Sequence, residues 1–198
     1  MITALISDVS GDQGLSWCEA LASVCDRIIV IVLGPEVGTR LPELKKLEAQ
    51  AELISVDADL ATVEGQARVA DCIRQMGPLT FLVHNPSRSS LFTDQPPGLD
   101  SELGFIRFQI DGLLTLVRAA TAGMQERGVG YVVVGPLLDG VDRAPHVAGS
   151  RAFVEAYLDS LSTMVADSGI GIVSAAAPMP SAELARWADT AKRRASAP

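Results

Sequence analysis

The sequence predicts one α/β domain over residues 1–198, built on a doubly wound parallel sheet of about six strands. Short apolar segments alternate with amphipathic segments along the chain, which is typical of strands joined by helical crossovers. The chain opens with a strand, a glycine-containing turn and a helix over residues 2–22, the arrangement with which many such sheets begin. No internal repeat or change of composition interrupts this alternation, so we expect a single domain.

Turn residues and hydrophobic spacing define the elements of the first half. The segment 27–33 is a continuous β-branched run, typical of a strand buried on both faces, and Gly34 and Pro35 end it. Apolar residues every three or four positions mark the helices. In this half we expect strands at 3–6, 27–33 and 52–57, and helices at 14–24, 41–51 and 63–76.

The second half continues the same alternation. Residues 86–100 are polar and rich in proline, so we expect a loop there, and Pro178 and Pro180 end the last strand. We expect strands at 79–85, 130–135 and 169–177, and helices at 101–127, 149–167 and 181–194. Residues 181–198 are thus a C-terminal helix with a frayed tail.

The composition argues against several classes of partner. The chain has 16 Lys and Arg against 24 Asp and Glu, a net charge of −8. Nucleic acids and anionic membranes attract basic surfaces, so we expect neither as a partner. No apolar run reaches the roughly 20 residues that span a bilayer, and the first residues lack the features of a signal peptide, which predicts a cytoplasmic protein. Three Cys and two His without ligand spacing predict reduced thiols and no metal site.

Seven segments, taken together, resemble the short-chain dehydrogenase/reductase family. They are ALISDVSGDQGLSWCEALA (4–22), VDADL (56–60), FLVHNPS (81–87), QIDGLLTLVRAATAGM (109–124), YVVVGP (131–136), SRAFVEAYLDSLS (150–162) and APMP (177–180). Their order and spacing follow the family over nearly the whole chain. The resemblance implies a Rossmann-like fold and NAD(P)-dependent chemistry. It also implies a substrate lid and a seventh strand, which we expect to be missing because only about twenty residues follow Pro178.

The resemblance places other residues at the family's catalytic positions. The catalytic Asn falls on Gln109, the Ser within 134–136, where no hydroxyl stands, the Tyr on Val147 and the Lys on Arg151. In that mechanism a phenol passes a proton to or from the substrate oxygen, which valine cannot do. Arg151 keeps the charge of Lys with a different donor geometry. We therefore expect no catalytic residue, with His146 as a conceivable surrogate acid or base.

The family's phosphate-binding turn is altered too. Asp8 and Asp12 stand where the family has its first two glycines, Gly14 remains in place, and Gly11 lies one residue early. A carboxylate about 4 Å from a phosphate charge costs roughly 4 kcal/mol at an effective dielectric near 20. We expect no cofactor, and expect Asp8 or Asp12 to cap the following helix. The vestigial site comprises Ser7, Asp8, Ser10, Gly11, Asp12, Gly14, Asp57 and Asn85.

These departures favour a non-catalytic subunit over an enzyme. As an isolated chain the protein is expected to have a structural or regulatory role, as a homodimer or as a heteromer with an active paralogue. The resemblance implies an interface through the helices at 101–127 and 149–167.

Two alternatives stay open. The first is an oxidoreductase that uses NAD or NADP on a carbonyl or alcohol, with His146 or Arg151 in the active site. The second is a small-ligand binding module at the strand ends, near Ser10, His84 and Asn85. The simpler interpretations are that His84 and Asn85 tether a loop and that His146 lies in an exposed loop.

Overall fold

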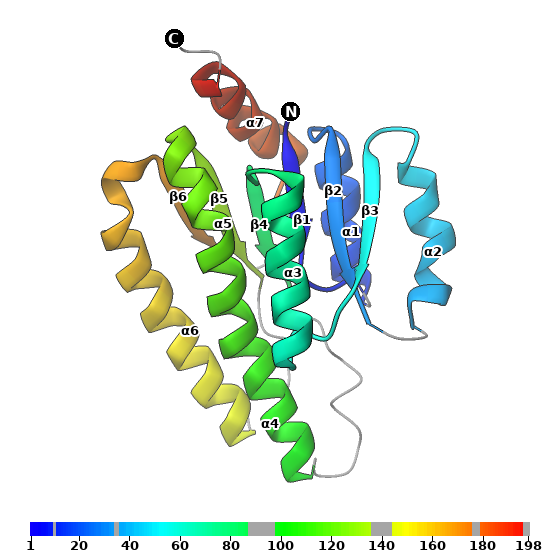
Figure 1. The fold of residues 1–198 in the computed structure, drawn as a ribbon, viewed down its shortest axis with the longest axis vertical. Helices are drawn as coiled ribbons and strands as arrows, with labels where there is room; N and C mark the ends of the chain where they lie inside the picture. Colours follow the sequence, from blue (N-terminus) through cyan, green and yellow to red (C-terminus); the bar gives the residue numbers. More distant parts are fainter. Residues whose placement is uncertain (10, 34–35, 87–97, 136–143, 176–178, 196–198) are drawn as a thin grey trace.

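Six strands form one parallel sheet in the order β3-β2-β1-β4-β5-β6 (Figure 1). The computed structural model describes residues 1–9, 11–33, 36–86, 98–135, 144–175 and 179–195. The strands are β1 (Thr3–Ile6), β2 (Arg27–Val32), β3 (Glu52–Asp57), β4 (Phe81–His84), β5 (Gly130–Val134) and β6 (Ile170–Ser174). All lie within the predicted ranges. The chain builds outward from β1 first on one side and then on the other, which confirms the predicted doubly wound α/β fold.

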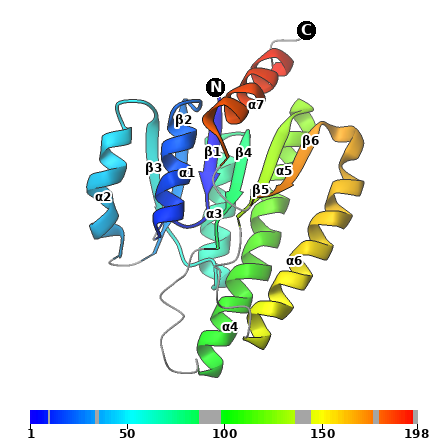
Figure 2. The same ribbon diagram turned by 180° about the vertical axis from the view of Figure 1, so that it is seen from behind.

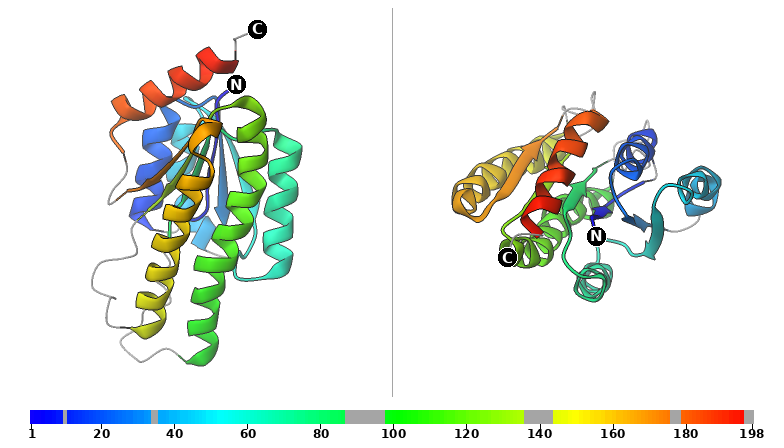
Figure 3. Two further views of the ribbon diagram at one scale, coloured as in Figure 1. Left: turned by 90° about the vertical axis from the view of Figure 1, so that its left-hand side faces the viewer. Right: turned by 90° about the horizontal axis from the view of Figure 1, so that it is seen from above.

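Helices cover both faces of the sheet, as Figure 3 shows from the side. One face carries α1 (Asp12–Ala22), α2 (Glu36–Leu47) and α7 (Ser181–Ala195) (Figure 2). The other carries α3 (Val63–Met76), α5 (Leu113–Arg127) and α6 (Pro145–Met164) (Figure 1). A hydrophobic core therefore lies on each side of the sheet, which explains why the central strands are apolar on both faces.

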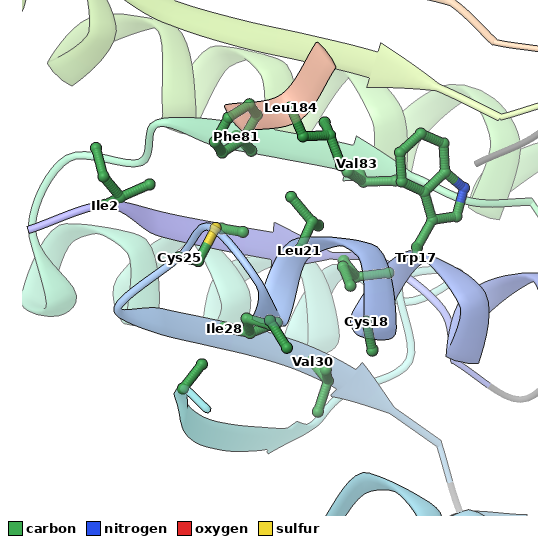
Figure 4. Packing of buried hydrophobic residues seen from close by; sticks show 14 of the residues in the cluster. Ile2, Trp17, Cys18, Leu21, Cys25, Ile28, Val30, Phe81, Val83 and Leu184 are labelled. Carbon is green, nitrogen blue, oxygen red and sulfur yellow. The ribbon is translucent and has the colours of Figure 1, made fainter. Parts of the chain in front are cut away.

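The core under α1 shows how the opening segment supports the sheet. Trp17 and Leu21 of α1 are buried against Ile28 of β2 and Val83 of β4 (Figure 4). Burying an apolar side chain of this size contributes roughly 1.5–3 kcal/mol. The opening strand–turn–helix unit is therefore part of the main core, whatever else it binds.

The helix predicted at 101–127 is one continuous helical segment of three parts. These are α4 (Leu99–Arg107), a π-helical segment η2 (Phe108–Gly112), and α5. The helix ends at Gly128, whose φ of 64° is the left-handed conformation that glycine adopts most readily. A π-helical turn inside an α-helix is uncommon and is often associated with function.

α2 lies earlier in the chain than predicted, at Glu36–Leu47 instead of 41–51. The N–H of Ala51 donates to Leu47 O at 3.1 Å, and the N–H of Glu52 donates to Asp26 O at 3.0 Å. The residues after Leu47 therefore turn the chain so that β3 can begin beside β2.

The helix predicted at 149–167 is also displaced. It is observed as α6, Pro145–Met164, followed by a short 3-10 turn at Ala166–Ser168. Pro145 occupies its first turn, where proline's fixed φ suits a helix and its missing N–H is not needed. The predicted range of 149–167 leaves this proline outside the helix. No helix in the described ranges combines the length and apolarity needed to cross a membrane.

Candidate functional site

The predicted site residues gather where the strand order changes direction, between β1 and β4. Ile6 of β1 pairs with Val83 of β4, so the residues that follow both strands lie at the same edge of the sheet. Ligands of doubly wound sheets bind in the crevice beyond such strand ends. Ser7, Asp8 and Asn85 meet at this point.

Asn85 fastens the two strand ends together. Its backbone N–H donates to Ser7 Oγ at 2.9 Å, and its side-chain Nδ2 donates to the carbonyl of Asp8 at 3.0 Å. The N–H of Ser7 in turn donates to Val83 O at 2.9 Å. Since Asn85 is fully buried, these bonds give it a structural role.

Gly14 keeps its predicted place and has a steric reason to be glycine. A Cβ built on it would lie 2.5 Å from Asp8 O, 2.6 Å from Val9 Cα and 3.2 Å from Asn85 Nδ2. No side chain fits there without moving the backbone. Gly14 therefore lets α1 pack directly on the end of β1, which is the role of the third glycine in a dinucleotide fingerprint.

The prediction that Asp8 or Asp12 caps α1 is wrong. The residue at the N-cap position is Gly11, in extended conformation with φ −95° and ψ 166°, and it has no capping side chain. Asp12 is the first helical residue, one position past the cap. Its exposed carboxylate lies in the first turn, where the helix dipole stabilises a negative charge.

Asp8 places a second acidic side chain at the same edge, and it is only 7% exposed. The start of α1 thus carries two carboxylates, at Asp8 and Asp12, where a pyrophosphate would need positive or neutral surroundings. Ser10 lies outside the described residues.

Asp57 lies apart from this group. It ends β3 opposite Val32 of β2, so β2 separates it from β1. Its carbonyl accepts a hydrogen bond from Arg68 Nη1 at 2.7 Å. The structure therefore brings Ser7, Asp8, Gly14 and Asn85 together and leaves Asp57 outside the group.

The catalytic positions lie on the other face of the sheet, where α6 packs against η2. Gln109 is a buried residue of η2, and Val147 is a buried residue in the first turns of α6. Val134, the described residue of the serine position, is also buried and apolar. Arg151 lies one turn after Val147 and is partly buried. Val147 thus provides no proton donor where the family has its tyrosine.

His84 is a buried neutral histidine beside Gln109. Its ring is fully buried and lies 5.3 Å, centroid to centroid, from that of Phe108. Burial lowers the pKa of His84 from 6.5 to about 4, and the neighbouring Gln109 side chain opposes the shift in part. At neutral pH the imidazole is therefore uncharged. Since neither His84 nor Asn85 is exposed, the structure offers no support for a ligand contact by either side chain.

His146 is not in an exposed loop. It lies in the first turn of α6 with its side chain only 7% exposed, and its Nδ1 is 3.6 Å from Glu102 Oε1 of α4. Its ring meets that of Phe105 edge-on, with centroids 5.5 Å apart. The sequence did not predict that Glu102 and Phe105, three residues apart on α4, contact His146. Their spacing on one helical face was the only available signal.

The described residues hold no group of three His, Cys, Asp or Glu side chains suited to a metal ion. Cys18 and Cys25 are buried among apolar neighbours, and burial raises the pKa of each thiol to about 12. These two cysteines are therefore inert as nucleophiles at neutral pH.

The sheet order, the helical layers and the glycine-containing turn define the fold of the short-chain dehydrogenases/reductases. The L-sorbose reductase of Gluconobacter frateurii, solved with NADPH and L-sorbose, is similar at a TM-score of 0.71 and 23% identity. The match covers 85% of this chain and 66% of that one, so the chain spans about two thirds of its length. The bulky-bulky ketone specific alcohol dehydrogenase of Comamonas testosteroni is similar at a TM-score of 0.72 and 18% identity, and the match covers 98% of this chain and 84% of that one. A short-chain dehydrogenase of Streptomyces avermitilis is similar at a TM-score of 0.63 and 23% identity, and the match covers 87% of this chain and 64% of that one.

No family model matches the chain, and no curated protein matches it in sequence. At identities below a quarter the structural similarity establishes the fold. The function rests on the residues at the site.

Proposed function

We propose that this protein is a non-catalytic subunit with the short-chain dehydrogenase/reductase fold, structural or regulatory in role. The observation that carries the proposal is Val147. It occupies the position of the family's tyrosine, is buried, and has no ionisable group. Gln109 and Arg151 depart from the family at two further positions. Proton transfer to a substrate oxygen needs a donor within hydrogen-bond reach, and Val147 has none to offer.

The start of α1 supports the same proposal. Asp8 and Asp12 put two carboxylates beside the helix N-terminus where a dinucleotide phosphate would bind. Gly14 and Asn85 keep the close packing of α1 on the strand ends, and steric fit and hydrogen bonding explain both without a ligand. We therefore expect neither NAD nor NADP to bind tightly.

The outer face of α6 supports a role in assembly, with a second copy or with an active paralogue. Phe153 is 39% exposed and stacks on Tyr157 with ring centroids 6.2 Å apart, while Met164 is 74% exposed. Exposed Ala152 directly precedes Phe153 in the helix, and exposed Ala156 directly precedes Tyr157. Apolar and small side chains let another helix approach closely, so α6, with α4 and α5 beside it, is the proposed interface.

Calorimetric titration of the purified chain with NADH and with NADPH tests the proposal. We expect no binding at micromolar concentrations. As a matched variant, Asp8→Asn with Asp12→Asn removes both charges while keeping the side-chain shapes. If the carboxylates repel the phosphates, the variant binds NADH at least tenfold more tightly than the native chain. Micromolar binding of either cofactor to the native chain would contradict the proposal.

The assembly is tested separately by the oligomeric state. Phe153→Glu places a charge on the α6 face and is expected to shift a dimer, or a complex with a co-purified dehydrogenase, toward the free chain. An association that this substitution leaves unchanged would rule out the helical interface without bearing on cofactor binding.

An NAD(P)-dependent oxidoreductase is the second candidate, because the similar L-sorbose reductase was solved with NADPH and a similar xylitol dehydrogenase with NAD⁺. If it is correct, a panel of sugars and ketones is turned over with NADPH or NADH. The His146→Ala variant then tests the surrogate acid or base. Absence of turnover across the panel would count against this candidate.

A further inference from the structure

β6 is an edge strand whose outer side is not covered by any strand in the described part of the chain. It lies at one end of the sheet, beside α6 (Figure 1). Gly171, Ile172 and Val173 are half-buried and Ser174 is exposed, whereas the inner strand β4 is buried throughout. The outer side of β6 thus differs from the strands inside the sheet.

The hydrogen bonds of the sheet show which backbone groups of β6 point outward. The N–H of Ala175 donates to Val134 O of β5 at 2.9 Å, so Ala175 faces β5. Successive residues of a strand direct their N–H and C=O groups to alternate sides. The backbone groups of Ile170, Ile172 and Ser174 therefore point away from the sheet.

The two edges of the sheet are protected differently. The opposite edge strand, β3, begins with Glu52 and ends with Asp57. Charged side chains on an edge discourage pairing with another chain. β6 has the sequence IGIVS, without a charge or a proline, and its β-branched residues favour strand pairing. Such an edge accepts a further strand through main-chain hydrogen bonds.

We propose that β6 pairs antiparallel with the β6 of a second copy of this chain and continues the sheet across a two-fold axis. The register that uses all outward-facing groups places Ile172 opposite its own counterpart and Ile170 opposite Ser174 of the other copy. In that register each facing pair exchanges two hydrogen bonds. The axis passes between the two Ile172 residues, perpendicular to the sheet.

The chemistry of β6 argues for a second copy as the occupant. The outward groups match themselves when rotated about this axis, so one strand supplies both halves of an isologous interface. Each copy has a net charge of −8, and an uncharged strand lets two copies meet without like charges facing each other. This contact uses the edge of the sheet instead of the outer face of α6, and it does not depend on the proposed function.

A cysteine placed on the axis tests the register. We use Ile172→Cys in a Cys72→Ser background, since Cys18 and Cys25 are buried and Cys72 is the half-buried thiol. Facing residues of a hydrogen-bonded pair have Cα atoms about 5.5 Å apart, within the range of about 4.4–6.8 Å for a disulfide. Oxidation is expected to give a covalent dimer on a non-reducing gel.

Ser174→Cys in the same background is the matched control. In the proposed register the two Ser174 residues are offset by four positions, about 13 Å, which is too far for a disulfide. A covalent dimer with Ile172→Cys but not with Ser174→Cys supports the proposal. Equal cross-linking of both variants, or of neither, overturns it.

A second variant tests the hydrogen bonds themselves. Ser174→Pro removes an outward-pointing N–H from an exposed position, which an edge strand tolerates. Sedimentation analysis of Ser174→Pro is expected to show a dimer dissociation constant raised at least about tenfold, because two symmetric hydrogen bonds are lost. The unfolding midpoint of the monomer should stay close to the native value. Unchanged self-association in this variant, or a native chain that is monomeric at every concentration, overturns the proposal.

Discussion

The buried histidine at the end of β4 makes the stability of this protein depend on pH. His84 is fully buried and its pKa lies near 4 instead of 6.5, with burial as the main cause. In the unfolded chain the same imidazole titrates near 6.5. Between these two values the unfolded chain binds a proton that the folded chain does not, so acidification favours unfolding.

The size of the effect follows from the two pKa values. The stability associated with neutral His84 is fully present above about pH 6.5 and is lost as the pH falls toward 4. Proton linkage gives a loss of about 2 kcal/mol between pH 7 and pH 5, and about 3 kcal/mol by pH 4. This is a large share of the 5–15 kcal/mol typical of a domain.

Urea unfolding at several pH values, for the native chain and for His84→Gln, isolates this contribution. Gln keeps an amide near Gln109 and cannot titrate, whereas every other ionisable group is common to both proteins. We expect the native chain to lose about 2 kcal/mol more than the variant between pH 7 and pH 5. Equal losses in the two proteins would refute the reasoning. If the variant does not fold, an NMR titration of the native His84 ring gives the pKa directly, and a value near 6.5 would refute it as well.

Three further substitutions and one control substitution test the packing at the site and around it, each by its urea unfolding midpoint. Gly14→Ala forces a Cβ into the backbone of Asp8 and should lower the free energy of unfolding by about 2–4 kcal/mol. The control is Gly104→Ala, whose Cβ meets nothing within 4 Å and which should stabilise α4 by about 0.5–1 kcal/mol. Similar effects of the two substitutions would contradict the steric argument. Asn85→Ala removes the side-chain hydrogen bond to Asp8 O, leaves the backbone N–H bond to Ser7 in place, and should cost about 1–3 kcal/mol, so a neutral result would deny the side chain its fastening role. Trp187→Ala removes the stack on Tyr131, with ring centroids 4.4 Å apart, and should cost about 2–3 kcal/mol, so an unchanged midpoint would show that α7 is held by other contacts.

The fold was predictable because its signals are local. The β-branched run of β2 and the regular apolar spacing of α3 each fix an element from a few neighbouring residues. The place of Gly14 also followed from the sequence, since its role depends on a turn of fixed length after β1. The order and spacing of these elements along the chain then sufficed to predict the topology of the sheet.

The details of the site depend on contacts between distant segments, which local patterns do not report. His146 meets Glu102, which lies 44 positions earlier in the chain, and that contact becomes visible only when α4 and α6 lie side by side. Gly11 takes the cap position that the sequence assigned to Asp8 or Asp12, because the path of the backbone after β1 decides where α1 begins.

The aromatic stack beneath α7 has a consequence for synthesis of the protein. Tyr131 of β5 and Phe81 of β4 lie on the face that α7 covers, and Trp187 of α7 completes their stack. Since α7 follows all six described strands in the chain, these rings stay uncovered until a ribosome has produced α7. A nascent chain that pauses before α7 would offer chaperones an aromatic surface that the finished protein hides.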